Sequence, residues 1–579
     1  MLFRPAQSEC PHCQGPLQVY KTQCRTLQSL HLGRFSAHET FLHCPRCHHD
    51  TIYAPEPLSQ LAPPGGTFGY DVLVFVGQEL FLRHLRVQDI VEELSAHHVR
   101  LSPSEVGYLA KKFVVYLALA HRQSAPQLQA ALRAQGGYIL HLDGTCDGGG
   151  PMLMSSLDSL SQIVLGSVKL PSEKTEQIIP FLQEIKARYG VPLATVHDMG
   201  TGILLAIKVV FPGVPDFICH FHFLRDLGKD LLEGDYEALR QRLRKHGLAQ
   251  KLLYQARRLK KALDQQPELI PSFCQSVQGG SLPPSAQLES FPRLCAYSLI
   301  QWALEAKHQR EGYGFPFDRP QVELARRLLV LGERLEQIQD IHLRGQWTDN
   351  KPLLRLSCEL RDFCADQGLQ RMLGALEVKI QVFDRLRNAM RIAEVGGVAG
   401  LNSGSESTAL GPIEKAVGKF RQQITSRSDY DSSPGWQGMI AQIDKYQEKL
   451  FADPITVPTP HGPLVIQPQR TNNIMERFFR DFRRGARRRT GQNSISRFLQ
   501  SMIADTLLVR NLENPGYLKI LLDGRATLEE RFAQIDIKTL REELQRAQES
   551  PEKVPSPIRK LIEVTGFAEK ISRLFQKAA

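Results

Sequence analysis

The stretch from Tyr138 to Asp226 constrains the fold of this chain more than any other. It begins with three apolar, β-prone runs, YILHLDGT, PMLMSSLDS and QIVLGSVKL, and the short polar breaks between them predict three antiparallel strands over residues 138–169. A helix is predicted next, over about 174–188, followed by the strand LATVHD, a second helix and the strand DFICH. We therefore expect a compact α/β unit in this part of the chain.

Two aspartates stand at the ends of these predicted strands. Asp143 leaves the first strand and Asp198 leaves the fourth. Taken singly, each is more simply explained as a turn or helix-cap residue, because aspartate is common after strands. Asp147 and Asp158 lie in the breaks between the first three strands, and we interpret both as turn formers.

The order of three strands, helix, strand, helix and strand, with an aspartate leaving the first and fourth strands, resembles the ribonuclease H-like fold. In that fold these two strands are neighbours, and neighbouring strands lie about 4.8 Å apart. Both carboxylates would then reach one pair of divalent ions, the arrangement that serves two-metal phosphodiester cleavage. Such a site needs a third carboxylate further along the chain.

Two Cys-x-x-Cys pairs lie near the N-terminus, and their four thiols suit a tetrahedral structural zinc ion. They are Cys10 with Cys13 and Cys44 with Cys47. The β-prone spacer between them predicts the hairpins of a zinc ribbon over residues 1–55. Two redox pairs are the alternative reading, and Cys24, His43, His48 and His49 are nearby substitute ligands. The chain has eleven cysteines and begins without an apolar export signal, so disulfides are not expected.

A proline- and glycine-rich linker separates this segment from two helices predicted within residues 71–122. Ser102 and Glu105 form a capping box around Pro103 at the start of the second helix. The pair resembles a DNA-binding helix-turn-helix, whose second helix would enter the major groove. A plain helical hairpin is the alternative, because Lys111 and Lys112 are the few basic residues on that helix.

Long amphipathic segments from about residue 231 to 455 predict an all-helical region. Cys219 and His222 stand just before it as a single Cys-x-x-His pair. The pair either contributes to a zinc site or packs as a buried thiol and a hydrogen-bonded imidazole. Its position beside the second aspartate makes it a candidate for a structural or site-flanking role.

A strongly basic helix is predicted after the helical region, in RTNNIMERFFRDFRRGARRRTG at residues 470–491. Positions 470–489 contain eight arginines and two acids, and the formal net charge of the whole chain is +11. Thr471 or Asn472 is placed to cap the helix, and Glu476 lies close to its first turn. A basic surface helix is the alternative, but it does not explain a lone glutamate at the head of a row of arginines. We therefore predict that Glu476 is the third carboxylate. The predicted phosphate clamps are Arg480, Arg483, Arg484, Arg487 and Arg488.

These features together resemble the DDE transposases of bacterial insertion sequences, over about residues 10–510. Asp143, Asp198 and Glu476 match the catalytic triad of that group. The TNNxxER stretch with its arginines, and the pair Cys219 and His222, look like those of the Mutator-like branch. The CPxC pairs resemble the zinc-binding segments of related insertion-sequence families. A helical insertion often separates the second aspartate from the glutamate in that group, which matches the 278-residue gap here.

The resemblance implies metal-dependent DNA strand cleavage and strand transfer. Asp143, Asp198 and Glu476 would hold two Mg²⁺ or Mn²⁺ ions, and Zn²⁺ would be structural. The expected partners are double-stranded DNA, as element ends and target, and a second copy of the chain in a homodimer or higher oligomer. No membrane partner is expected, because no apolar run reaches the roughly 18 residues of a bilayer span. We expect a cytoplasmic, nucleoid-associated protein.

Two other functions remain open at this stage. A domesticated, sequence-specific DNA-binding protein would carry the same DNA-binding segments without transposition activity. A non-transposing ribonuclease H-like nuclease would share the acids, although it would hardly need a zinc ribbon and a long helical insertion.

A chain of 579 residues exceeds a single core, so several domains are expected. The predicted fold class is an α/β ribonuclease H-like catalytic core interrupted by a large all-α insertion, with an N-terminal zinc ribbon and helix-turn-helix. The predicted segments are the zinc ribbon (1–55), the helix-turn-helix-like region (71–122), the first part of the core (136–230), the helical insertion (231–455), the second part of the core with the glutamate helix (465–525) and a helical tail (526–579).

Overall fold

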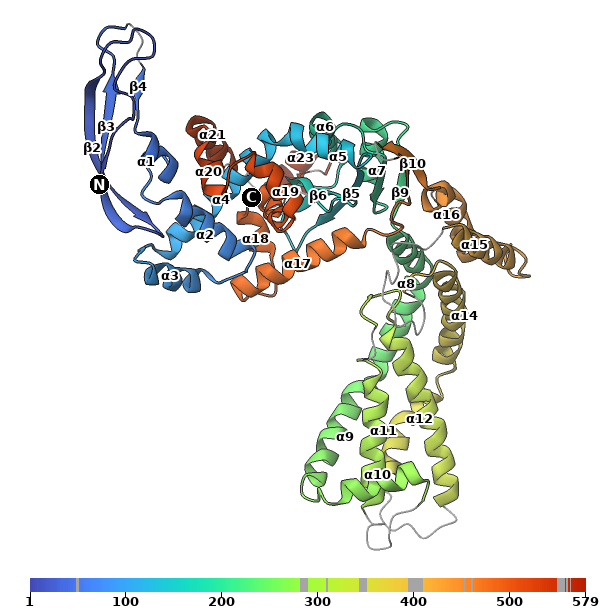
Figure 1. The fold of residues 1–579 in the computed structure, drawn as a ribbon. Coiled ribbons are helices and arrows are strands. Elements are labelled where there is room, and N and C mark those ends of the chain that lie inside the picture. The colour runs from blue at the N-terminus through green and yellow to red at the C-terminus, as the bar shows by residue number, and fades with distance from the viewer. Residues whose placement is uncertain are drawn as a thin grey trace. The chain divides into compact units, whose positions relative to one another are not determined.

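The computed structural model describes residues 1–47, 51–281, 290–308, 311–342, 351–393, 410–451, 453–459, 462–548, 558, 561–562 and 564–578. The chain divides into two compact units (Figure 1). The discontinuous unit combines Met1–Cys219 with Ala452–Ala579, and the helical unit is His220–Phe451. The helical unit is thus inserted in the sequence of the other. It begins at His220, within the segment predicted as 136–230.

A long antiparallel hairpin forms the N-terminal part of the discontinuous unit. Strands β2 (Gln18–Ser29) and β3 (Gly33–His43) pair from Gln18 opposite His43 to Ser29 opposite Gly33. Two short strands, β1 (Leu2–Phe3) and β4 (Ile52–Tyr53), add to β3. The two β-prone runs between the cysteine pairs therefore form strands, as predicted.

Helices from both ends of the discontinuous unit share one hydrophobic core. In α4, Phe113 and Tyr116 contact the ring of Phe532, with ring centroids 5.7 and 5.1 Å apart. Part of the segment predicted as a tail therefore belongs to this core. The helices of this region are α1 (Glu56–Leu61), α2 (Tyr70–Phe81), α3 (Val87–Ala96), α4 (Pro103–Gln123), α5 (Ala125–Ala134), α18 (Ser496–Ser501), the 3₁₀ helix η2 (Ala504–Glu513), α19 (Pro515–Leu522), α20 (Leu528–Ala533) and α21 (Ile537–Gln548), with α23 (Phe567–Ala578) near the C-terminus.

The predicted capping box at the start of α4 is confirmed. Ser102 Oγ accepts from the backbone N–H of Glu105 at 3.3 Å, and Glu105 accepts from the backbone N–H of Ser102 at 2.6 Å. The second half of α4 is buried almost all round, with Leu117 and Ala120 fully covered. Apart from Gln123 at its last position, only the first turns of this helix, which include Tyr108 and Lys111, carry fully exposed side chains. The DNA-reading role of this helix stays a prediction, and it would be limited to those turns.

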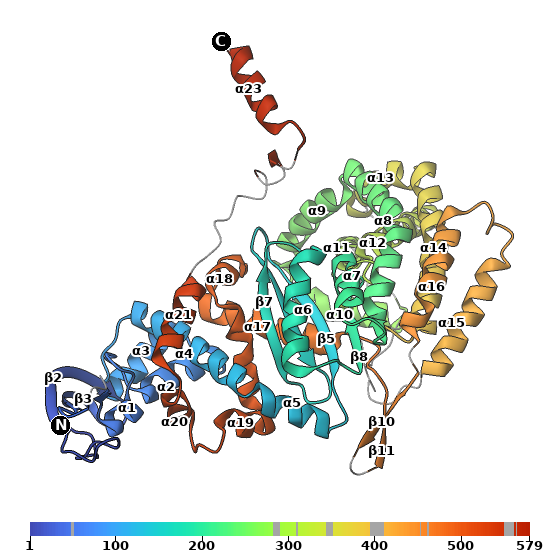
Figure 2. The same ribbon diagram turned by 90° about the horizontal axis from the view of Figure 1, so that it is seen from above.

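A mixed five-stranded sheet lies in the middle of the discontinuous unit (Figure 2). Its strand order is β7-β6-β5-β8-β9, in which the first three strands are antiparallel and β5, β8 and β9 are parallel. The predicted strands and their order along the chain are confirmed. Their bounds are β5 (Ile139–Thr145), β6 (Met152–Asp158), β7 (Val164–Leu170), β8 (Ala194–His197) and β9 (Asp216–Ile218).

Helices and a hairpin cover the sheet. Helices α6 (Thr175–Tyr189) and α7 (Thr201–Val210) pack against each other on one side, and α17 (Asn473–Thr490) runs along the other side and contacts β5 (Figure 2). Gly202 is needed at this packing, because a Cβ there would lie 1.8 Å from the Glu173 carbonyl oxygen. The hairpin of β10 (Ile455–Thr459) and β11 (Gly462–Ile466) contributes Val457 and Ile466 to a small apolar cluster with β5 and β8.

The helical unit is built from amphipathic helices, as the sequence predicts. Its first helix begins beside the end of its last one, because His220 Nε2 donates to the Leu450 carbonyl at 2.6 Å. The unit consists of α8 (His220–His246), α9 (Leu248–Leu263), α10 (Leu269–Gly279), α11 (Phe291–Glu305), α12 (Pro320–His342), α13 (Lys351–Cys364), α14 (Gln367–Ala389), α15 (Leu410–Thr425) and α16 (Pro434–Leu450).

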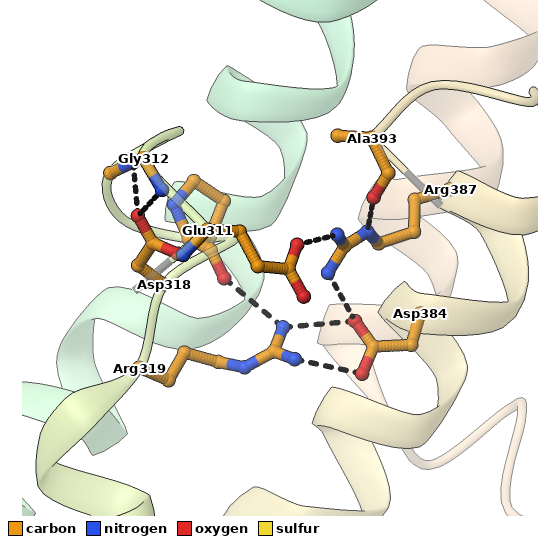
Figure 3. Close-up of polar contacts among 9 residues, drawn as sticks. Glu311, Gly312, Asp318, Arg319, Asp384, Arg387 and Ala393 are labelled. Carbon is orange, nitrogen blue, oxygen red and sulfur yellow. Dashed lines mark hydrogen bonds and ion pairs between the residues drawn. The ribbon is translucent and has the colours of Figure 1, made fainter. Parts of the chain in front are cut away.

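A buried arginine network ties the loop before α12 to α14 (Figure 3). Arg387 is 1% exposed and donates to Glu311 at 2.7 Å, to Asp384 at 3.4 Å and to the Ala393 carbonyl. Arg319 makes a two-point contact with the same Asp384 at 2.9 and 2.8 Å. Because the charges are paired, this network holds the loop in place without leaving a buried ion alone.

No described helix combines the length and the apolar character needed to cross a membrane.

Candidate functional site

Asp143 and Asp198 stand at the same edge of the central sheet. Strands β5 and β8 are parallel neighbours with Leu140 opposite Thr195 and His141 opposite Val196. Extending this register by two residues sets Asp143 opposite Asp198, which directly follows the last residue of β8, His197. Asp143 itself lies within β5, two residues before the strand ends at Thr145, and not at the strand end as predicted, because the pairing of β5 with β6 continues past it. Neighbouring strands are about 4.8 Å apart, so this register brings the backbones of the two aspartates close together.

Local hydrogen bonds hold each aspartate in place. Asp143 is 7% exposed, and its Oδ1 accepts from the backbone N–H of Gly144 at 2.8 Å. Asp198 Oδ1 accepts from the backbone N–H of Gly200 at 3.1 Å, just before α7 begins. The adjacent His197 is fully buried and bridges the Asp198 carbonyl and the Asp216 carboxylate, at 2.5 Å from each. His197 therefore fixes the backbone that carries Asp198.

The third predicted acid is brought to this edge by the start of α17. Asn472 occupies the N-cap position, as predicted for Thr471 or Asn472, and its carbonyl accepts from the backbone N–H of Glu476 at 3.0 Å. The Asn472 side chain bonds to His141 Nδ1 at 2.9 Å and to the Leu142 carbonyl at 2.8 Å. Since Leu142 precedes Asp143, Glu476 lies one helical turn from a residue anchored beside that aspartate.

Glu173 is a further carboxylate near these acids that sequence reasoning missed. A Cβ on Gly144 would lie 3.5 Å from Glu173 Oε1. Partial loss of hydration and repulsion from Asp198 raise the pKa of Glu173. The signal available in the sequence is its place between the third strand and the first helix, where a loop returns to the sheet edge.

The arginines of α17 divide between an exposed row and two more buried positions. Arg480, Arg484, Arg487 and Arg488 are exposed, together with Arg477, which was not predicted, whereas Arg483 and Arg489 are half-buried. The buried face of the helix carries Met475, Phe478, Phe479, Gly485 and Ala486. In the part of the chain that the structure describes, none of the five exposed guanidinium groups forms an ion pair with a carboxylate. The row therefore presents unneutralised positive charge beside the acids.

The glycine-rich turn after β5 is anchored to the end of this basic helix. Asp147 accepts from the backbone N–H of Ile495 at 2.5 Å and from Ser494 Oγ at 3.0 Å. These two bonds hold the pKa of Asp147 below its ordinary value. Asp158 accepts from the backbone N–H groups of Ile139 and Ser161 at 3.0 and 2.8 Å. Both aspartates thus shape turns, in agreement with the sequence interpretation.

Cys219 has a specific contact at the start of the same helix. Its thiol is 1% exposed and accepts from the backbone N–H of Asn472 at 3.1 Å. His222 lies in α8, the first helix of the other unit. Among the described residues, the pair does not belong to a group of three or more potential metal ligands. The role of Cys219 that these contacts support is structural, at the N-terminus of α17.

The four predicted zinc ligands are gathered at the base of the N-terminal hairpin. The Sγ atoms of Cys10, Cys13, Cys44 and Cys47 all lie within 4.8 Å of one another. The Cys10–Cys47 and Cys13–Cys44 separations are 3.6 and 3.5 Å. Four sulfurs at about 2.3 Å from a tetrahedral zinc ion are about 3.8 Å apart, so the donor set fits zinc. Cys24 and His43 lie outside this group, and His48 and His49 lie outside the described residues.

The thiols of this cluster differ in acidity, as crowded sulfurs do. Burial raises the pKa of Cys10, but hydrogen bonds from the backbone of His12 and Cys13 outweigh it, and the pKa falls to about 6. The neighbouring Cys13 thiol and burial raise the pKa of Cys47. Four thiolates at this spacing repel one another unless a cation neutralises them, which favours a bound metal ion.

The chemical type of the predicted acids suits divalent ions, but their spacing does not form a compact ligand cluster. Carboxylates and water are the ligands that Mg²⁺ prefers, at about 2.1 Å. Among the described residues the cysteine cluster is the one group whose ligand atoms all lie within 4.8 Å, and the three acids are spread more widely.

Comparisons with known proteins add similarity at the level of structure. No family model matches this chain, and no curated protein matches it significantly. The chain is similar to the Drosophila P element transposase strand transfer complex, with a TM-score of 0.32 and 10% sequence identity. That alignment covers 82% of this chain and 96% of the other. A TM-score of this size does not establish a shared fold, so the function has to be inferred from the residues and their contacts.

Proposed function

We propose that this protein is a DNA transposase with a ribonuclease H-like core that cleaves and joins DNA strands through Asp143, Asp198 and Glu476. One observation carries the proposal. The β5–β8 register and the attachment of Asn472 to β5 draw acids that are far apart in sequence toward one edge of the sheet.

In this proposal Asp143, Asp198 and Glu476 hold two Mg²⁺ or Mn²⁺ ions. When bound, such ions activate the attacking oxygen and stabilise the leaving oxygen of a phosphodiester. The protein's own contribution is to hold its carboxylates and the DNA in fixed positions, because alignment of attacking and leaving oxygens supplies much of the rate enhancement. Water would be the first nucleophile, bonding to phosphorus at the element end while the 3′-oxygen leaves as a 3′-hydroxyl. That hydroxyl would then attack a phosphorus of the target strand at the same acids and displace the target's own 3′-oxygen, so the number of phosphodiester bonds is conserved in the joining step.

The exposed arginine row of α17 is the proposed contact for the DNA backbone. Arg480, Arg484, Arg487 and Arg488 project from the helix that carries Glu476, so phosphates bound there lie next to the acids. Guanidinium groups without carboxylate partners bind phosphate without first breaking an ion pair. A homodimer or larger assembly on DNA belongs to the proposal, because two element ends must be brought together.

The test is cleavage and joining of a plasmid that carries the gene's own flanking DNA, with Mg²⁺, by wild type and by variants. Asp143→Asn, Asp198→Asn and Glu476→Gln are each expected to abolish both reactions while DNA binding stays intact. Glu173→Gln is the matched acid control. Because Glu173 is not one of the three acids proposed to hold the ions, this substitution is expected to lower the rate roughly 10- to 100-fold at most. If Glu476→Gln keeps full activity and Glu173→Gln loses it, the third carboxylate has been assigned to the wrong residue.

The same assay separates the two other functions. Cleavage that depends on these acids but yields no joined product would indicate a nuclease that does not transpose. Intact sequence-specific binding with no metal-dependent product from wild type would indicate a domesticated DNA-binding protein.

A further inference from the structure

The side chain at the N-cap of α17 does not cap its own helix. Asparagine at this position usually accepts from a backbone N–H two or three residues later. Asn472 makes no such bond. Its Oδ1 instead accepts from His141 Nδ1 at 2.9 Å, and its Nδ2 donates to the Leu142 carbonyl at 2.8 Å. The oxygen and the nitrogen of the side-chain amide therefore both bond to strand β5.

The backbone of Asn472 is held as tightly as its side chain. Its N–H donates to Cys219 Sγ at 3.1 Å, and its carbonyl accepts from the backbone N–H groups of Met475 and Glu476, both at 3.0 Å. The residue is 0% exposed. Cys219 in turn donates its backbone N–H to the His197 carbonyl at 2.8 Å, next to Asp198. One residue thus connects β5, the end of β8 and the first turn of α17.

We propose that Asn472 is a positioning residue that sets Glu476 against Asp143 and Asp198 by clamping the start of α17 to the sheet edge. The inference rests on the proposed function, because it assumes that these three acids act together. A displacement of about 1 Å is enough to cost roughly 100-fold in rate at a site that works by alignment. The helix carrying Glu476 is joined to β5 across more than 300 residues of sequence, so chain connectivity alone does not fix that distance.

A clamp and an ordinary helix cap respond differently to substitution. Aspartate and serine are good N-cap residues, so Asn472→Asp and Asn472→Ser would preserve a role limited to capping. An ionised aspartate only accepts, so it cannot donate to the Leu142 carbonyl. A serine hydroxyl can donate and accept, but it is one atom on a shorter side chain, whereas Asn472 reaches His141 with Oδ1 and Leu142 with Nδ2. The clamp therefore predicts that Asp and Ser fail to rescue the loss seen with Asn472→Ala.

Two readouts test the clamp in the full-length protein. In the plasmid cleavage assay, Asn472→Ala, Asp and Ser are expected to raise the Mg²⁺ concentration for half-maximal cleavage at least about tenfold, with the KM for DNA unchanged. In the second assay Fe²⁺ replaces Mg²⁺ without DNA, and peroxide with ascorbate generates hydroxyl radicals that cut the polypeptide near the bound ion. Wild type is expected to give fragments ending near Asp143 and near Glu476, and the Asn472 variants to keep the first and lose the second.

The neighbouring Asn473 provides the matched control. It has the same side chain at the first helical position, and in the described part of the chain its amide makes no hydrogen bond to β5. Asn473→Ala is expected to behave like wild type in both assays, and thermal unfolding of every variant identifies any that does not fold. If the Asn472→Ala variant does not fold, the Asn472→Asp variant tests the clamp instead, by its Mg²⁺ dependence and its cleavage fragments.

The outcomes separate failure of the clamp from failure of the proposed function. The clamp is overturned if Glu476→Gln abolishes cleavage while Asn472→Ala behaves like Asn473→Ala, or if Asn472→Asp or Ser restores wild-type Mg²⁺ dependence. The proposed function itself is wrong if the wild-type protein gives no fragment near Asp143 and the Glu476→Gln variant cleaves DNA as well as wild type does. The clamp proposal is then wrong as well.

Discussion

Arg387 is a charged residue whose role is stability within the helical unit. Its guanidinium group is 1% exposed and lies over the ring of Phe317, with 5.4 Å between the guanidinium carbon and the ring centroid. Pairing with Glu311 and Asp384 offsets the cost of removing it from water. A helical pattern in the sequence places Arg387 on an amphipathic helix but gives no sign that it is buried.

Substitution of Arg387 is therefore expected to destabilise the helical unit. Arg387→Ala leaves Asp384 and Glu311 with one partner fewer and should lower the free energy of unfolding by about 3 kcal/mol, measured by urea denaturation. Arg421→Ala is the control, because its pair with Asp444 is 44% and 40% exposed. That change should cost less than about 1 kcal/mol. Equal effects of the two substitutions would contradict the assigned role of the network.

At the scale of single elements, α17 combines two functions on two faces. One face packs Met475 and Phe479 into the core, and the other exposes a row of arginines. The sequence predicted both the helix and its charge, because arginines at helical spacing are visible directly. It did not predict that Arg483 is half-buried, which depends on the neighbouring elements.

Loss of one exposed arginine from this row should weaken binding to DNA equally for all DNA sequences. Arg484→Ala is expected to lower the magnitude of the slope of log K against log salt by about 1, because one phosphate contact is lost. Arg133→Ala, on the exposed side of α5, is the control and should leave the slope unchanged. The measurement is a salt titration of binding to a DNA duplex, and an unchanged slope for Arg484→Ala would exclude that residue from the interface.

The cysteine cluster of the N-terminal hairpin should behave as one structural zinc site. The purified protein is expected to contain about one zinc ion per chain, and chelation should increase hydrogen exchange in residues 1–47. Cys44→Ser should lose the metal. Cys24→Ser is the matched control, because Cys24 is exposed on β2 outside the cluster. Zinc content measured by atomic emission that falls equally in both variants would contradict the assigned ligands.

At the scale of the whole molecule, the helical unit has the properties of an insertion. Its first and last helices meet at the hydrogen bond between His220 and Leu450, so its ends lie together. The hydrophobic core that contains Phe113 and Phe532 consists of residues of the discontinuous unit alone. Insertions with adjacent ends are tolerated because the host chain continues almost as if uninterrupted.

Replacement of residues 220–451 by a short Gly/Ser linker should therefore leave the remaining chain folded. The shortened protein is expected to unfold cooperatively and to keep its zinc, with binding of divalent ions at the acids reduced only modestly. Calorimetry and Mn²⁺ binding measure these properties. A truncation at residue 219 without the C-terminal part is the contrasting control and should not fold, because it lacks α17 and Phe532. A molten product from the linker variant would show that the two units do not fold independently.

The sequence by itself determined which elements form and in what order. Alternating apolar runs, glycine and proline breaks and capping residues are local signals, so strands β5 to β9, helix α17 and the capping box at Ser102 were predictable. Asp143, Asp198 and Glu476 could be selected as candidates because local patterns predict that each ends a strand or starts a helix. The tertiary structure alone decided how these elements meet. The contact of Asn472 with β5, the approach of Glu173 and the burial of α4 against α20 join residues far apart in the chain, and no local pattern encodes a distance of that kind.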